Sequence, residues 1–398
     1  MRYENFLNPI STAELERRWS AIRRIMDARG IDALVMQNSN DHLGGYVRWF
    51  TDIPATNGSP RTVIFSRDGS MTLIEQGPRH AEQNIKVGDP VFRGISRRMF
   101  SPSYCSVHYT RHYDAECTIR EIRRRGYRVI GLVATAAMYF DFCQQLKDGL
   151  AGTIEFVDAT DFVDDIKVVK SPEEINCIRK TAKMQDEVFR RVLKQVRPGM
   201  RDFEVTALAQ YVGHCLESEQ GTFNGVSAPI GEPSSLHLHR HEQGRVIQEG
   251  DHFNLLIENN GPGGFYTEIA RTLVFGRATN ELQDAFERCK EAQQATLSQL
   301  RPGAACSDIF AAHNAFMHSQ GLPEEKRLFA HGQGYDLVER PLIRDDETMM
   351  VREGMNFAIH PGFSTDRLFM TVCDNFIVSG SGQGERLHST PQQIFEMC

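Results

Sequence analysis

The chain has 398 residues, of which 40% are hydrophobic and 24% are charged, a composition typical of a globular protein with room for two domains. Its formal net charge of −7 leaves no basic excess to neutralise phosphates, so nucleic acid is not an expected partner. The opening segment has no apolar signal-peptide core, and no apolar run approaches the roughly 18 residues that span a bilayer. Nine cysteines without a C-x-x-C pair are typical of reduced thiols, which favours a cytoplasmic protein.

The first part of the chain predicts a mixed α/β domain. Ser11 is placed to cap a helix over residues 12–29, where apolar residues recur at helical spacing until Gly30. Further elements are expected as a buried strand at 31–37, two strands around an Asp-Gly turn at 62–76, a strand at 127–135 and a helix at 140–150.

A long amphipathic helix is expected to open the second part. Ser171 is followed three residues later by Glu174, which is the pattern of a capping box, and Pro172 stands at the first helical position. We therefore place the domain boundary just before this helix and predict domains at 1–163 and 164–398.

The second domain contains two segments that are similar in sequence. QVRPGMRDFEVTALAQYVGHCLESEQG (195–221) is similar to QLRPGAACSDIFAAHNAFMHSQG (299–321), and strand-like segments follow each, at 252–276 and 356–378. A duplication predicts a pseudo-twofold domain with a site between its halves. The alternative is that Arg-Pro-Gly simply recurs as a helix stop.

Four segments in this order resemble the creatinase/prolidase/methionine-aminopeptidase superfamily. They are KVVKSPEEINCIRK (167–180), GDHFNLLIENNGPGGFYTEIARTLVFG (250–276), HGQGYDLVERP (331–341) and EGMNFAIHPGF (353–363). With the N-terminal domain, the resemblance covers nearly the whole chain. It implies an α/β fold with a creatinase-type N-terminal domain, a pseudo-twofold pita-bread catalytic domain and a homodimer.

The resemblance also implies that the ligand set for metal has changed. Metallopeptidases of this superfamily hold two metal ions with two aspartates, one histidine and two glutamates. Carried over by position, these ligands fall on Glu258, Glu268, His331, His360 and Cys373, where the register at Glu258 is uncertain. Only the histidine at 331 is retained.

These changes argue against a pair of metal ions. A dinuclear site needs carboxylates to balance about four positive charges, and its ligand geometry is held to tenths of an ångström. A single ion held by His331, His360, Cys373 and Glu268 remains an alternative, since histidine and cysteine suit zinc. Creatinase is the precedent for a metal-free member, and we predict no metal or other cofactor here.

The altered pocket suits hydrolysis of an amidine or guanidine. A carboxylate can pair with the N–H groups of such a cation, and acid/base groups can attack its electrophilic carbon. Among metal-free relatives, GPGGFYTEIART resembles the ectoine hydrolases, which open a cyclic amidine to give N-acetyl-2,4-diaminobutyrate. The resemblance implies that Glu268 is the nucleophile or the general base, and that His331 or His360 protonates the leaving nitrogen.

Further site residues are predicted with their alternatives. Three histidines alternate in SLHLHRHEQGR (235–245), and counting back from Gly250-Asp251 selects His239 as the proton shuttle, the other two being polar rim residues. Trp49 is expected to stack on a flat cationic substrate or to belong to the core of its own domain. The substrate-binding residues predicted in all are Glu258, Tyr266, Cys373 and Trp49.

The sequence thus predicts a metal-independent homodimeric hydrolase of a small zwitterionic amidine, with ectoine as the first candidate. One alternative is a metal-dependent Xaa-Pro peptidase with unusual ligands, and another is a creatinase-like hydrolase of a different guanidine or amidine. A third is a non-enzymatic pita-bread binding module. Four ionisable residues kept together, Glu268, His331, His239 and His360, argue against the binding module.

Overall fold

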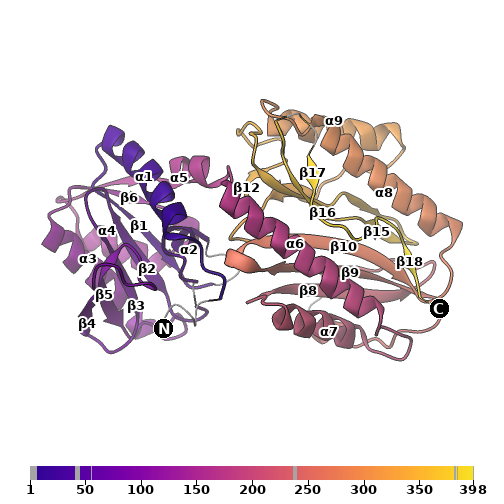
Figure 1. Cartoon of the computed structure of the whole chain (residues 1–398), viewed down its shortest axis with the longest axis horizontal. Coiled ribbons are helices and arrows are strands. Elements are labelled where there is room, and N and C mark those ends of the chain that lie inside the picture. Colours follow the sequence, from indigo (N-terminus) through magenta and orange to yellow (C-terminus); the bar gives the residue numbers. More distant parts are fainter. Residues whose placement is uncertain are drawn as a thin grey trace. The chain divides into compact units, whose positions relative to one another are not determined.

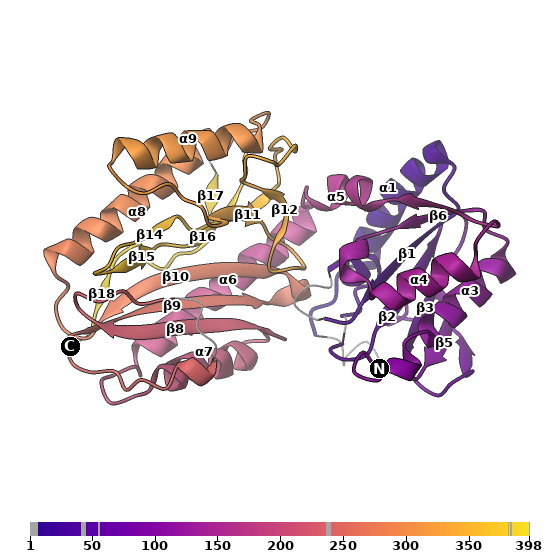
Figure 2. The same ribbon diagram turned by 180° about the vertical axis from the view of Figure 1, so that it is seen from behind.

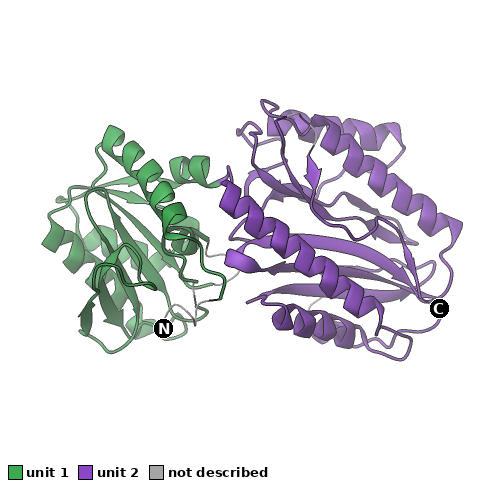
Figure 3. Cartoon of the chain, in the orientation of Figure 1, with its two compact units in different colours: residues 1–167 green, residues 168–398 purple. Residues whose placement is uncertain are grey.

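The computed structural model describes residues 7–40, 45–54, 56–235, 240–380, 382 and 384–397. The chain divides into two compact units, Met1–Lys167 and Val168–Cys398 (Figure 3). The boundary expected from the sequence, between 163 and 164, falls inside the helix α5 (Thr160–Lys167) that ends the first unit.

The first unit is a mixed sheet flanked by helices. Helix α1 (Thr12–Arg29) begins where Ser11 Oγ accepts the backbone N–H of Glu14 and ends at Gly30 in the left-handed conformation, as the sequence predicts. The Asp-Gly turn joins β2 and β3 as an antiparallel pair. The described strands of the sheet, in the order β4-β5-β3-β2-β1-β6-β7, are β1 (Ala33–Asn38), β2 (Arg61–Ser66), β3 (Met71–Gln76), β4 (Glu82–Asn84), β5 (Ile95–Ser101), β6 (Val129–Leu132) and β7 (Glu155–Asp158).

Helices α2 (Gly45–Thr51), α3 (Tyr113–Arg125) and α4 (Phe140–Gly149) complete this unit, with α5. Residues of α3 and α4 pack against β1, β2, β3, β5 and β6 in one buried apolar cluster. This unit therefore has a core of its own.

The second unit begins with a helix pair on a sheet. The capping box of Ser171 and Glu174 is present at the start of α6 (Pro172–Leu193). Helices α6 and α7 (Asp202–Cys215) bury one apolar face against β8 (Gly221–Pro229), β9 (Asp251–Asn260) and β10 (Tyr266–Val274). Figure 1 shows α6 lying along this sheet, whose strand order is β18-β10-β9-β8, with β18 at Phe395–Glu396.

A second helix pair and sheet repeat the plan. Helices α8 (Asn280–Gln299) and α9 (Cys306–Ser319) cover the later strands, as the view from behind also shows (Figure 2). These strands are β11 (Ala330–Gly332), β12 (Glu339–Leu342), β13 (Asn356–Ile359), β14 (Gly362–Ser364), β15 (Phe369–Thr371), β16 (Asp374–Ile377) and β17 (Glu385–Arg386). Each half thus has two helices on a sheet, which is the pseudo-twofold arrangement that the two similar segments predict.

The two sheets of this unit meet along β10. The backbones of Ala270 and Cys373 form an isolated antiparallel bridge, and Tyr266 donates its N–H to the carbonyl of Gly334 at 2.7 Å. Side chains of β10 that point away from α6 and α7 therefore face the second sheet. Among the described residues, no helix is both long enough and apolar enough to cross a membrane.

Candidate active site

Two glutamates lie directly opposite each other on neighbouring strands. Glu258 of β9 and Glu268 of β10 are partners in an antiparallel ladder that runs without a register shift from Tyr266–Asn260 to Val274–His252. Partners in such a ladder project their side chains from the same face of the sheet. The side chain of Glu258, whose place in the motif was uncertain, therefore projects from the same face of the sheet as that of Glu268.

Two histidines from the second sheet face the carboxylate of Glu268. The Nε2 atom of His331 lies 3.8 Å from Glu268 Oε2, and the Nε2 atom of His360 lies 3.9 Å from the same oxygen. Strands β11 and β13 pair, and His360 directly follows β13, so the two imidazole centroids are 5.2 Å apart. His331 Nδ1 lies 2.9 Å from the carbonyl oxygen of Gly332, so Nδ1 carries the proton and Nε2 presents a lone pair toward Glu268.

Burial shifts the pKa values of these groups. It raises the pKa of Glu268 to about 7, against smaller lowering effects from the Cys373 thiol and the Arg327 charge. Burial, and then the charge of Glu268, raise the pKa of Glu258 well above its ordinary value. Burial lowers the pKa of His331 to about 4. Without a bound ion, His331 is therefore neutral at pH 7 and Glu268 is half ionised, a division typical of acid/base pairs.

Two buried amides, which the sequence analysis missed, connect the glutamates. Asn375 Oδ1 accepts the N–H of Glu268 at 2.6 Å, and Asn375 Nδ2 donates to Gln333 Oε1 at 2.9 Å. Gln333 Nε2 then donates to Glu258 Oε1 at 2.9 Å, while Thr222 Oγ1 lies 3.3 Å from Glu258 Oε2. The only sequence signal for these amides was their spacing from predicted site residues. Gln333 is two residues after His331, and Asn375 is two residues after Cys373.

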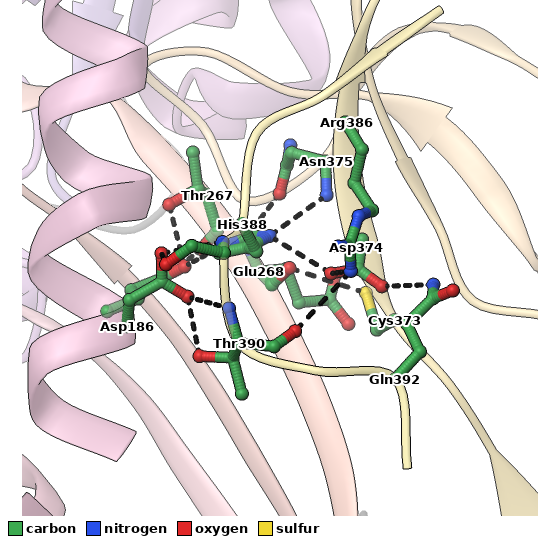
Figure 4. Close-up of polar contacts among 12 residues, drawn as sticks. Asp186, Thr267, Glu268, Cys373, Asp374, Asn375, Arg386, His388, Thr390 and Gln392 are labelled. Atoms are coloured by element: carbon green, nitrogen blue, oxygen red, sulfur yellow. Dashed lines mark hydrogen bonds and ion pairs between the residues drawn. The ribbon is translucent and has the colours of Figure 1, made fainter. Parts of the chain in front are cut away.

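Cys373 lies behind Glu268. Its Sγ donates to the backbone carbonyl of Glu268 at 3.6 Å, and burial raises the pKa of this thiol well above its ordinary value. The next residue, Asp374, which Figure 4 labels, forms a buried ion pair with Arg271 at 2.7 Å. Cys373 is therefore a neutral packing residue beside the site.

The remaining predicted residues are Tyr266, Trp49 and His239. Tyr266 is buried on the same face of β10 as Glu268, because alternate residues of a strand share a face. Trp49 is 1% exposed in α2, with its ring edge on Phe50 and the guanidinium of Arg18 5.3 Å from its ring centroid. Within its unit Trp49 is a core residue, which corrects the stacking interpretation. His239 lies outside the described residues.

The chain belongs to metallopeptidase family M24, whose model matches residues 176–386, more than half of its length. An Xaa-Pro dipeptidase of Pyrococcus horikoshii is 23% identical over 68% of this chain and 75% of its own length. The creatinase of a Bacillus species is 23% identical over 88% of this chain and 82% of its own. The crystal structure of the X-Pro aminopeptidase of Thermotoga maritima superposes with a TM-score of 0.77 at 17% identity, covering 95% of this chain and 99% of that one.

These relatives establish the creatinase/prolidase-like pita-bread fold and a hydrolase family. A site for two metal ions, as the resemblance to the metallopeptidases implies, does not fit the residues present here. Glu258 is engaged by Gln333 and Thr222, and the Cys373 thiol donates to the backbone carbonyl of Glu268. Two carboxylates remain to balance about four positive charges.

A single ion fits better. One ligand atom each of Glu268, His331 and His360 lies within 4.8 Å of the other two, the one such group of three among the described residues. Two imidazoles with one carboxylate are a donor set suited to zinc. The Nδ1 contact of His331 with a carbonyl is also the contact that orients metal-binding histidines.

Proposed function

We propose that this protein is a metal-independent cytoplasmic hydrolase of a C–N bond in a small amidine, with ectoine as the first candidate substrate. The observation that carries the proposal is the carboxyl pair. Glu268 has a pKa of about 7 and faces two imidazoles, and burial raises the pKa of Glu258, directly opposite, well above its ordinary value. A base that titrates near the working pH combines ionisation with proton affinity.

The reaction requires one nucleophile and one proton donor. If Glu268 is the general base, it activates a water molecule that attacks the amidine carbon. If Glu268 is the nucleophile, its carboxylate attacks that carbon first, and water then hydrolyses the covalent intermediate. One C–N bond breaks, and the leaving nitrogen takes up a proton, so a cyclic amidine becomes an amide carrying a free amine. His331 presents a lone pair at Nε2 and suits proton acceptance, which leaves His360 or Glu258, whose pKa burial raises, as the donor.

The amidinium cation also suits this pocket as a ligand. Its N–H groups can pair with the carboxylate of Glu268, as guanidinium groups pair with carboxylates. Substrate binding would then favour the ionised form of Glu268. Burial favours the uncharged form of the nearby carboxyl of Glu258, since it raises the pKa of this group.

A second candidate is a hydrolase with a single metal ion. The group formed by Glu268, His331 and His360 supports it, because these three side chains would hold the ion. A bound zinc would supply Lewis-acid activation of the scissile group. The family relatives named Xaa-Pro dipeptidase make a dipeptide the natural substrate to assay for this candidate.

One assay separates these candidates. Purified protein is analysed for metal content and assayed on ectoine, creatine and an Xaa-Pro dipeptide, with and without a chelator. We expect chelator-insensitive opening of ectoine. Stoichiometric zinc or manganese with chelator-sensitive dipeptide cleavage would instead establish the metal-dependent candidate, and binding of a protein partner without any turnover would favour a binding module.

A variant tests the role of Glu268. Glu268→Gln keeps the size of the side chain but removes the nucleophile or base, and we expect turnover to fall about 10²- to 10⁴-fold. Glu287→Gln, on the exposed side of α8, is the matched control and should keep wild-type turnover. Full ectoine turnover by Glu268→Gln would refute the role.

A further inference from the structure

Arg327 is anchored beside the turn that carries His360. Its Nε and Nη2 atoms donate to Glu325 at 3.1 and 2.6 Å, and Nη2 also lies 3.4 Å from the carbonyl oxygen of His360. Glu325 is 4% exposed and accepts the N–H of Gly362 at 3.2 Å. The guanidinium is therefore held in place by a buried carboxylate.

The same guanidinium lies beside residues that pack around the strand of Glu268. It is 5.7 Å from the ring centroid of Phe369, which packs in one small apolar cluster with Leu256, Ala270 and Cys373. These residues come from the strands that carry the glutamates and from the segment behind Glu268. Arg327 also contacts the backbone of His360, whose Nε2 atom lies 3.9 Å from Glu268 Oε2.

One edge of the guanidinium is available to a ligand. The Arg327 side chain is 36% exposed, and no described residue accepts a hydrogen bond from its Nη1 atom. An arginine that keeps one partner through Nε and Nη2 can still donate through Nη1 and the outer side of Nη2. Such fixed guanidinium groups are well suited to carboxylates.

We propose that Arg327 binds the carboxylate of a zwitterionic substrate whose amidinium lies against Glu268. The inference rests on the proposed amidine hydrolysis and adds a substrate requirement to it. A small molecule with both charges meets a carboxylate and a guanidinium in the same site, whereas an amidine without an acid group uses only one of them. The enzyme therefore selects acid-bearing amidines through complementary charge.

The test uses two amidines that differ by one group. Ectoine carries a carboxylate, and 2-methyl-1,4,5,6-tetrahydropyrimidine is the same ring without it. Calorimetric binding and turnover of both are measured on the wild type and on Arg327→Gln. We expect the wild type to prefer ectoine about ten- to a hundredfold in affinity, the range for a hydrogen bond to a charged group. Arg327→Gln should lose this preference and bind 2-methyl-1,4,5,6-tetrahydropyrimidine with the same affinity as the wild type.

Arg327→Gln leaves Glu325 buried without its partner and is therefore at risk of misfolding. The double variant Glu325→Gln/Arg327→Gln removes both charges, and thermal unfolding verifies its fold. Arg179→Gln removes an arginine from an exposed pair with Glu385 and should leave the preference unchanged. Retention of the preference in both Arg327 variants, with turnover intact, overturns the inference but not the proposed function.

A third probe separates the two failures. Propionate has the carboxylate alone, and its binding to the wild type and to the Arg327 variants is followed by NMR titration. Weaker propionate binding in the variants, while the wild type cleaves neither amidine, would refute amidine hydrolysis and support the role of Arg327. Equal propionate binding in all proteins, with no ectoine preference in the wild type, overturns the role of Arg327.

Discussion

Glu258 and Glu268 are the same residue type in the same ladder, yet their surroundings give them different chemistry. Glu258 accepts a hydrogen bond from Gln333 and feels the charge of Glu268. Glu268 faces two imidazole nitrogens and is influenced by the positive charge of Arg327. Because the two carboxyl groups interact, their titration near neutral pH belongs to the pair, and Glu268 is the member that faces the imidazoles.

The pH dependence of turnover follows from the pKa of Glu268. The proposed chemistry needs the ionised carboxylate, and its pKa is about 7. We expect kcat/KM to rise about tenfold per pH unit below this value and to level off above it. His331, with a pKa of about 4, stays neutral through this range and contributes no limb. A kcat/KM for ectoine that does not change between pH 5 and 8 would contradict the role of Glu268.

Some residues of the candidate site can be predicted from the sequence, and others cannot. His331, His360 and Glu268 were found because a family motif assigns them, although no local pattern shows that they converge. Gln333 and Asn375 were missed, since an amide in a strand acquires a role only through the partner that it faces. That partner is set by the meeting of β10 with β16, which the sequence does not encode locally.

Strand β11 positions His331 through a close approach of two backbones. A Cβ added at Gly332 would lie 2.4 Å from the carbonyl oxygen of Arg340 in β12, so the strand must shift to accept one. The variant Gly332→Ala should lose about 1–3 kcal/mol of unfolding free energy. Because His331 moves with the strand, turnover should fall as well. Gly244→Ala, where a Cβ meets nothing within 4 Å, is the control, measured by urea unfolding and by assay.

A buried arginine fastens the last segment of the chain to β10. Arg271 pairs with Asp374, and it also donates to the carbonyls of Thr390 and Pro391 (Figure 4 shows Asp374 and Thr390). The pair holds the pKa of Asp374 down to about 2. Since this pKa is below the ordinary value of 3.8, the stabilisation is complete above about pH 4 and is lost as the pH falls through about 2.

Arg271→Leu should therefore destabilise the second unit strongly. It removes the buried arginine that pairs with Asp374 and leaves this carboxylate with Gln392 at 2.7 Å and the half-exposed Arg386 at 3.8 Å. Removal of one member of a buried pair costs about 3–5 kcal/mol. Arg179→Gln breaks an exposed pair and should cost about 1 kcal/mol or less. Guanidinium unfolding of both variants measures the difference. Equal stability of the two variants would show that the buried pair is not a structural support.

At the scale of the whole molecule, the resemblance to creatinase-like proteins leads us to predict a homodimer. Light scattering after size exclusion should give twice the chain mass of 45.1 kDa. A mass of one chain at assay concentration, with full turnover, would contradict a dimer requirement.

The architecture was predictable where local signals are strong. The cap of α1, the Asp-Gly hairpin and the capping box of α6 each depend on a few neighbouring residues, and all three are present. The order of motifs gave the pita-bread fold. Trp49 shows the limit, because an aromatic residue in a turn-rich segment carries no sign of whether it faces a ligand or a core.

The glutamate pair has a consequence for folding. Both carboxyl groups depend on one two-stranded ladder, and a slip of a single residue would turn either strand's side chains to the opposite face of the sheet. A pairing of β9 with β10 in a shifted register therefore does not bring Glu258 opposite Glu268. The rate at which turnover returns during refolding therefore reports the rate at which β9 and β10 reach their native register.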